Sequence, residues 1–286
     1  MSLLARPRHA CNCRSICDAS NETAMQRLKD ILRLSSSGKP AVDLESTLEA
    51  GFFGRFPPVL SVHFAWRSDD GKSFIFFIKD ETTDTAERLY AFSVGRRRAH
   101  NSLTLYAGMD PETSPALALA GKDRNSRSSS IITLPREIAP DSTKEPCIRR
   151  LENTGRLKSL SELFHFRMLV AGTGIEEDFE WRGGSAWGNR RVSERNLVRM
   201  RESTGKGEIE EVVGVWNDET PSFTRGNKLG TFQFLGSGST GELGPAWALM
   251  AVMTLLRILE INGAGPEALA AMSSGSGGKI LGPGVI

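Results

Sequence analysis

Residues 245–262, which read PAWALMAVMTLLRILEIN, form the only long apolar run in the chain. Pro245 suits the first turn of a helix, Ala, Leu and Met dominate the run, and Asn262-Gly263 is a helix stop signal. Its ten large apolar residues cannot all share one stripe, so this helix is apolar on every side. Such a helix must be enclosed, either by lipid or by protein.

Protein is the expected enclosure of this helix. A membrane-spanning helix needs about 20 apolar residues, and Arg257 and Glu260 interrupt the run. Because these two charges are three residues apart, they can pair on one helix face near an exit from a core. A membrane span stays open as the alternative.

Short β-rich segments without intervening helical patterns precede the helix. Strands are predicted at residues 59–66, 73–79, 88–94, 102–107, 116–120, 130–134, 164–170, 178–181, 196–200, 211–216 and 229–235. An antiparallel sheet of eleven or twelve such strands curls and closes, which removes its exposed edges. We therefore expect a mainly β protein, an antiparallel barrel of about twelve strands whose wide lumen is filled by the C-terminal helix.

The expected barrel domain covers residues 45–271, with no internal cavity of the lipocalin type. Residues 1–44 are expected to be an N-terminal extension, partly disordered, with a short amphipathic helix at 21–34. Residues 272–286 are rich in Gly and Ser and are expected to be a disordered tail.

Three of the four cysteines, Cys11, Cys13 and Cys17, lie close together near the N-terminus among basic residues. The four cysteines do not form a disulfide framework, and their arrangement suits a reducing compartment. Cys11, Cys13 and Cys17 are candidates for lipidation beside basic residues. A targeting segment, a weak metal site and a tail without chemistry remain alternatives.

The net charge of +2 gives no overall attraction to nucleic acid, so we expect no nucleic-acid partner and look for local patches. Three segments are rich in basic residues: Arg96, Arg97 and Arg98; Lys122, Arg124 and Arg127; and Arg190 and Arg191, followed by Arg195, Arg199 and Arg201. If two of them converge, they form a site for an anion or a lipid headgroup. The alternative is a set of solvated loops balanced by acidic residues.

Catalytic signals are weak in this chain. His63 and His165 alternate with apolar residues in predicted strands, which favours outward-facing structural histidines. The acidic run Glu176-Glu177-Asp178 is interpreted as a solvated turn, and the glycine-rich residues 236–241 as a flexible crossover from barrel wall to barrel axis. No nucleophile elbow, zinc-protease motif or P-loop occurs. We expect no enzyme, no catalytic residue, no cofactor and no metal.

The order of strands and helix resembles the tubby C-terminal-like superfamily, which includes tubby-like proteins, phospholipid scramblases and plant LURP-one-related proteins. The resemblance covers roughly residues 54–265 and is closest to uncharacterised fungal members. It rests on the strand-like segments 103–107, 115–120, 131–135, 179–182, 196–200, 212–216 and 230–234 and on the terminal helix.

The resemblance implies a twelve-stranded barrel around a central hydrophobic helix. Tubby-like proteins bind phosphoinositides through basic side chains on the barrel, whereas scramblases carry a membrane-inserting C-terminal helix beside a calcium site. Neither the phosphoinositide-binding pair nor the calcium site can be assigned to positions here. We expect a monomeric, cytoplasmic binding module, peripheral to a membrane, that takes an anionic phospholipid headgroup or a protein partner on its basic loops. A scramblase-like membrane protein and a structural domain without a ligand are the alternatives.

Overall fold

The computed structural model describes residues 48–49, 51–67, 73–83, 87–95, 103–126, 128–136, 147–155, 163–183, 194–203, 207–219 and 228–262. The expected N-terminal extension, its helix at 21–34, the cysteines Cys11, Cys13 and Cys17 and the tail at 272–286 lie outside these residues.

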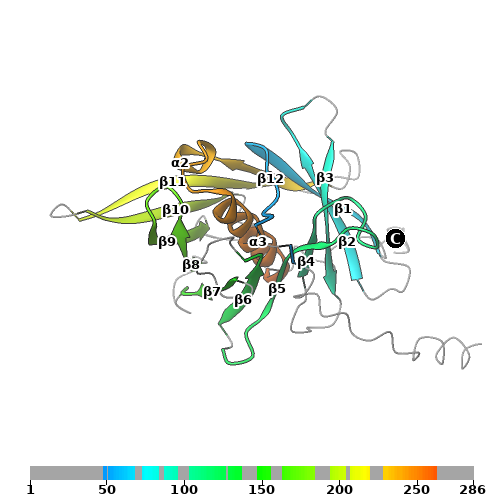
Figure 1. Cartoon of the computed structure of the whole chain (residues 1–286), viewed down its shortest axis with the longest axis horizontal. Coiled ribbons are helices and arrows are strands. Elements are labelled where there is room, and N and C mark those ends of the chain that lie inside the picture. Colours follow the sequence, from blue (N-terminus) through cyan, green and yellow to red (C-terminus); the bar gives the residue numbers. More distant parts are fainter. Residues whose placement is uncertain are drawn as a thin grey trace, which may run out of the picture. The chain divides into compact units, whose positions relative to one another are not determined.

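The described residues fold into a closed antiparallel β-barrel (Figure 1). Every strand pairs with its neighbours in sequence, and β12 pairs with β1 to close the barrel. This architecture confirms the predicted fold class. The twelve strands are β1 (Val59–Arg67), β2 (Ser73–Asp80), β3 (Arg88–Gly95), β4 (Leu103–Tyr106), β5 (Ala116–Lys122), β6 (Ser129–Leu134), β7 (Cys147–Asn153), β8 (Leu163–Val170), β9 (Ile175–Gly183), β10 (Glu194–Ser203), β11 (Gly207–Asp218) and β12 (Lys228–Phe234).

Strand β7 is the one strand that the sequence pattern did not predict. Its sequence CIRRLEN is mostly polar, and Leu151 is its only buried residue, while Ile148 is exposed. The strand forms because β6 pairs with it along its whole length, from Ser129–Glu152 to Leu134–Cys147. Backbone pairing with β6 therefore holds this strand, although its sequence lacks the hydrophobic alternation that usually identifies a strand.

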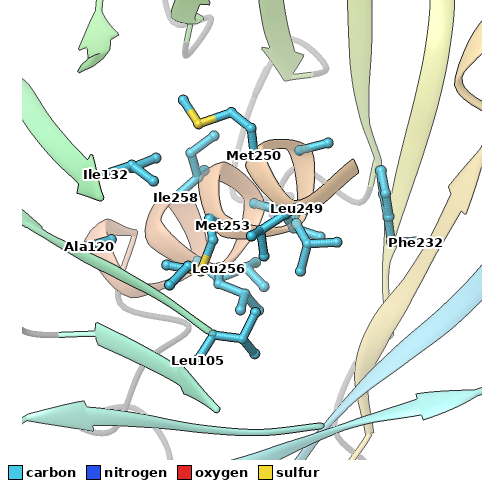
Figure 2. Close-up of a cluster of buried hydrophobic side chains, with 14 of the residues drawn as sticks. Leu105, Ala120, Ile132, Phe232, Leu249, Met250, Met253, Leu256 and Ile258 are labelled. Atoms are coloured by element: carbon cyan, nitrogen blue, oxygen red, sulfur yellow. The ribbon is translucent and has the colours of Figure 1, made fainter. Parts of the chain in front are cut away.

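Helix α3 (Pro245–Ile261) lies along the barrel lumen, as predicted, and is packed most closely against β5, β6 and β8. Figure 2 shows Leu249, Met253 and Leu256 of the helix among side chains of the wall, which include Leu105 and Ile132. Every residue from Leu249 to Leu259 is buried. The hydrophobic surface on all sides of the helix is thus covered by protein.

Two polar contacts fix α3 to the wall. The indole N–H of Trp181 in β9 donates to Thr254 Oγ1 at 2.9 Å. Near the helix end, Arg257 Nε donates to Ser130 Oγ of β6 at 2.9 Å, and Arg257 Nη1 lies 2.6 Å from Glu260 Oε2. The predicted pairing of Arg257 with Glu260 is confirmed, and it lies where the helix leaves the core.

The glycine-rich residues 236–241 carry the chain from β12 to α3, as expected, but part of them forms the short helix α2 (Gly236–Ser239). The following turn is held on the β8–β9 turn, because Gly172 N donates to Glu242 O at 3.1 Å. Gly244 precedes α3 with φ +87°, and a Cβ there would lie 2.7 Å from that of Ala171. Only glycine fits at this close approach.

The two ends of the barrel differ in the segments that lie on them. At the end where α3 begins, α2 packs against β11 and residues 242–244 lie on the β8–β9 turn, while residues 51–58 run past β3, β5 and the end of β6. We call this the capped end. At the other end α3 leaves the barrel beside Ser130, and we call it the exit end.

Candidate functional site

The exit end carries the strand ends that flank all three predicted basic segments. The register pairs Val94 with Leu103, Lys122 with Ser130, and Gly183 with Arg195 at this end. The connections β3–β4, β5–β6 and β9–β10 therefore all start and finish at the same end of the barrel. The sequence alone could not show this, because it depends on the number and direction of the strands.

Lys122 and Arg124 are the predicted site residues that the structure describes. Both are exposed, Lys122 at the end of β5 and Arg124 in the turn that follows. Among the described residues, neither side chain has a hydrogen bond or an ion pair. Arg96, Arg97, Arg98, Arg127, Arg190 and Arg191 lie outside the described residues.

Asp123, between the two exposed cations, holds the loop in place. Its side chain is buried and accepts hydrogen bonds from Asn125 N at 2.8 Å and from Ser129 Oγ at 3.0 Å. Arg150 Nε of β7 lies 3.6 Å from the same carboxylate. The buried acid turns inward and leaves Lys122 and Arg124 pointing away from the barrel.

Arg195, Arg199 and Arg201 do not belong to a basic loop, so the interpretation of the third segment is wrong for these three. They lie in β10, and each is within ion-pair distance of a carboxylate. Arg195 Nη1 is 3.3 Å from Asp218 Oδ2 at the exit end, whereas Arg199 and Arg201 lie near the capped end. Their charge is balanced by acids in β9, in β11 and in the turn before α3.

Arg199 is the centre of the polar cluster at the capped end. Its guanidinium is fully buried and donates to both oxygens of Glu177, from Nη2 at 2.8 Å and from Nε at 2.5 Å. Its Nη1 donates to Ser237 Oγ of α2 at 2.9 Å and to Glu242 Oε1 at 3.0 Å. Ser237 in turn donates to Glu211 of β11. The cluster therefore ties three strands to the segment that leads into α3.

The charges in this cluster stabilise one another. Burial acts to raise the pKa of Glu177, but the hydrogen bond and charge of Arg199 outweigh it, so that pKa lies below its ordinary value. The hydrogen bond from Arg199 likewise lowers the pKa of Glu242. These carboxylates stay ionised at neutral pH and act as partners of the buried guanidinium.

The alternation of residues in β9 and β10 indicates this cluster, although no motif marks it. Arg199 comes two residues after Leu197 in an alternating strand, so its side chain points inward like that of Leu197. Its partner Glu177 precedes Phe179 by two residues in the same way. An inward charge on each of two adjacent strands predicts a buried pair.

The acidic run Glu176-Glu177-Asp178 is not a solvated turn, because it lies in β9. Asp178 accepts a bidentate pair of hydrogen bonds from Arg167 of β8, at 3.0 and 2.9 Å, and another from His165 at 2.7 Å. The hydrogen bond from Arg167 lowers the pKa of Asp178. The acidic side chain of Asp178 is thus neutralised by residues of the neighbouring strand, a pairing that the linear sequence does not show.

The two strand histidines are on the outer face of the barrel and hydrogen-bonded, as expected for structural histidines. His63 Nε2 is 2.9 Å from Ser61 Oγ and 3.9 Å from Glu81 Oε1. Because the serine and the acid approach the same ring nitrogen, the three residues do not form a catalytic triad, in which the acid holds the other nitrogen. Burial, together with the charge of Lys79, lowers the pKa of His63 to about 4.

Within the described part of the chain, no group of three or more His, Cys, Asp or Glu side chains is arranged to hold a metal ion. Among these residues, no helix has both the length and the apolar character needed to cross a membrane.

Comparison with known proteins gives no further assignment. No protein-family model matches the chain, and no curated protein or solved structure matches it.

Proposed function

We propose that the protein is a non-enzymatic binding module of the tubby-like type, which docks on anionic phospholipid headgroups through the exit end of its barrel. The closed barrel around a central hydrophobic helix is the architecture that the resemblance implies, which supports the proposal. On this proposal the protein works in the cytoplasm at a membrane surface.

The observation that carries the proposal is the pair Lys122 and Arg124. Both cations are exposed at the exit end, and among the described residues no acid neutralises either side chain. Most described arginines near them in the barrel, such as Arg150 and Arg195, lie close to a carboxylate. An arginine fork binds phosphate oxygens in pairs, and a basic residue near an anionic membrane contributes about 1 kcal/mol.

Docking fits the described structure better than insertion of the last helix. The apolar side chains of α3 are buried against the barrel wall, and Trp181 and Ser130 bond to it. Insertion of α3 into lipid would expose the core that it fills. The scramblase-like alternative therefore needs the barrel to open, whereas headgroup binding does not.

Vesicle sedimentation tests the proposal. Full-length protein is mixed with phosphatidylcholine vesicles, with and without phosphoinositide, at near-physiological salt. We expect binding only with phosphoinositide, and we expect the double variant Lys122→Ala/Arg124→Ala to weaken it roughly thirtyfold, from about 1 kcal/mol for each cation.

The matched control removes two exposed arginines from the capped end. Arg55→Ala/Arg136→Ala changes the net charge by the same amount but should leave vesicle binding unchanged. Absence of phosphoinositide-dependent binding by the wild-type protein would overturn the lipid proposal. Equal losses in both double variants would mean that net charge, and not the exit end, controls binding.

A further inference from the structure

The four serines that follow Arg124 fall into two pairs, one in the loop between β5 and β6 and one in β6 itself. Ser129 and Ser130 are buried at the start of β6, whereas Ser128 is exposed and Ser126 is half-buried in the loop. The sequence shows only a serine-rich run beside basic residues. The structure shows that two of the hydroxyls are buried and two are not.

The inner pair holds the structure together. Ser129 Oγ donates to the buried Asp123 at 3.0 Å, and Ser130 Oγ accepts from Arg257 of α3 at 2.9 Å. Neither hydroxyl can react with an external molecule unless the strand and the end of α3 separate.

The outer pair has only weak local contacts at its hydroxyls. Ser126 Oγ and Ser128 Oγ are 3.3 Å apart, and Ser128 N donates to Ser126 Oγ at the same distance. The backbone carbonyl of Ser128 accepts from Asn153 N at 2.8 Å, so Ser126 is the less restrained of the two. Its hydroxyl can reach an external reagent.

The outer serines lie beside the two exposed cations of the exit end. Arg124 comes two residues before Ser126, and Lys122 four residues before it. A protein kinase that binds basic residues ahead of the target serine holds such cations with its own carboxylates. The loop thus combines an accessible hydroxyl with the charges that this class of kinase recognises.

We infer that Ser126 and Ser128 form a phosphorylation site for a basic-directed protein kinase, and that phosphate there releases the exit end from anionic lipid. The second part rests on the proposed function. In the transfer, the serine oxygen forms a bond to the γ-phosphorus of ATP, and the bond from that phosphorus to the β–γ bridging oxygen breaks. ADP leaves, and the hydroxyl proton passes to the base of the kinase.

The effect on membrane binding follows from charge. A phosphoserine carries about −1.5 to −2 charges at neutral pH, which is close to the combined charge of Lys122 and Arg124. The phosphate can also bind these cations directly and occupy the donors that lipid phosphates would use. Phosphorylation therefore turns an attractive surface into a neutral or repulsive one.

The direct test incubates the full-length chain with ATP and the catalytic domain of a basic-directed protein kinase, followed by peptide mass spectrometry and vesicle sedimentation. We expect phosphate on Ser126 or Ser128 and none on Ser129 or Ser130. The phosphorylated protein should bind phosphoinositide vesicles roughly thirtyfold more weakly than the untreated protein.

Charge variants repeat the test without a kinase. Ser126→Glu/Ser128→Glu should reproduce the loss, whereas the neutral variant Ser126→Gln/Ser128→Gln should not. Ser239→Glu places a charge on the exposed serine of α2, at the capped end, and should leave binding unchanged.

Three outcomes would contradict the inference, and two of them are distinct from failure of the proposed function. Phosphate confined to Ser129 or Ser130, or no phosphate on the loop, overturns the modification site. Stoichiometric phosphate on Ser126 or Ser128 with unchanged vesicle binding overturns the release, while the proposed function stands. If the untreated protein binds no vesicles, the proposed function itself fails, and the release fails with it.

Discussion

Arg199 is the most deeply buried charged side chain among the described residues, with no exposed surface. Burial of a guanidinium is costly unless its hydrogen bonds are made. Here Glu177, Glu242 and Ser237 accept those bonds, and two of these partners lie in the segment that leads into α3. The residue therefore stabilises the closure of the capped end as well as β9 and β10.

Replacing Arg199 by Met should lower the free energy of unfolding by about 3 kcal/mol or more, because the largely buried Glu177 then loses both hydrogen bonds from the guanidinium. Urea denaturation at neutral pH measures the loss. Glu242→Gln is the control: Glu242 is 44% exposed, and its loss should cost less than about 1 kcal/mol. An Arg199→Met variant as stable as the wild type would show that the cluster does not stabilise the capped end.

His63 should make stability depend on pH in a mildly acidic range. The folded pKa is lowered from 6.5 to about 4, mainly by burial, so the unfolded chain takes up a proton at a higher pH than the folded protein. Stability contributed by neutral His63 is therefore lost as the pH falls from 6.5 towards 4.

The variant His63→Gln should remove this dependence. As the pH falls from 7 to about 5, the wild type should lose about 1 kcal/mol more than the variant, a figure reduced from the full linkage value because the ring is near solvent. Thermal or urea unfolding at several pH values checks it. Parallel curves for the two proteins would mean that His63 titrates alike in the folded and unfolded chains.

At the scale of elements, α3 provides much of the core although it is the last element among the described residues. Every residue from Leu249 to Leu259 is buried, and strands β4, β5, β6 and β12 supply side chains that surround it (Figure 2). A barrel of twelve strands is too wide for its own side chains to fill. The wall and the helix therefore depend on each other.

A chain that ends at Gly241 should lose its cooperative unfolding transition and aggregate, because its barrel exposes the surface that α3 covers. A chain that ends at Asn262 keeps α3 and should stay folded, as the full chain does. Solubility and size-exclusion chromatography compare the three. If the chain ending at Gly241 is soluble and folded while the full chain needs detergent, α3 acts as a membrane anchor and not as core.

An element can be predicted from the sequence where its own residues show an apolar pattern, and not where pairing with a neighbouring strand holds it in place. Strands β1 and β2 were predicted because their inward residues are apolar in every second position or more, and α3 because its apolar residues cover all its sides. The pattern does not predict strand β7, because Leu151 is its only buried residue and the strand is held mainly by pairing with β6.

The polar contacts were less predictable than the elements. Glu177 and Arg199 are adjacent only after β9 and β10 pair, and Asp178 meets Arg167 only across β8 and β9. A linear run of charges does not show which side chains are neutralised. That Lys122 and Arg124 lie at the same end of the barrel as the strand ends of two other basic segments likewise follows only from the strand count and direction.

At the scale of the whole barrel, the two ends differ in what they offer to a partner. The capped end is closed by α2 and by the Arg199 cluster, whose charges are paired. The exit end presents Lys122 and Arg124, which have no acidic partner among the described residues. A barrel with exposed cations at one end should bind an anionic surface through that end. Because such binding depends on charge, a salt series can distinguish docking from insertion of α3.

Raising the salt concentration from about 0.1 M to about 1 M shortens the screening length from roughly 10 Å to roughly 3 Å. If exposed cations hold the protein on phosphoinositide vesicles, this change should weaken binding by at least roughly tenfold and release the bound protein. Vesicle sedimentation over a salt series measures it, with Lys122→Ala/Arg124→Ala expected to give a shallower dependence. A helix inserted in lipid is held by apolar contact, which salt does not weaken. Protein that stays on the vesicles at high salt and resists carbonate extraction would therefore mean that α3 leaves the barrel to enter the bilayer, and the docking proposal would fall.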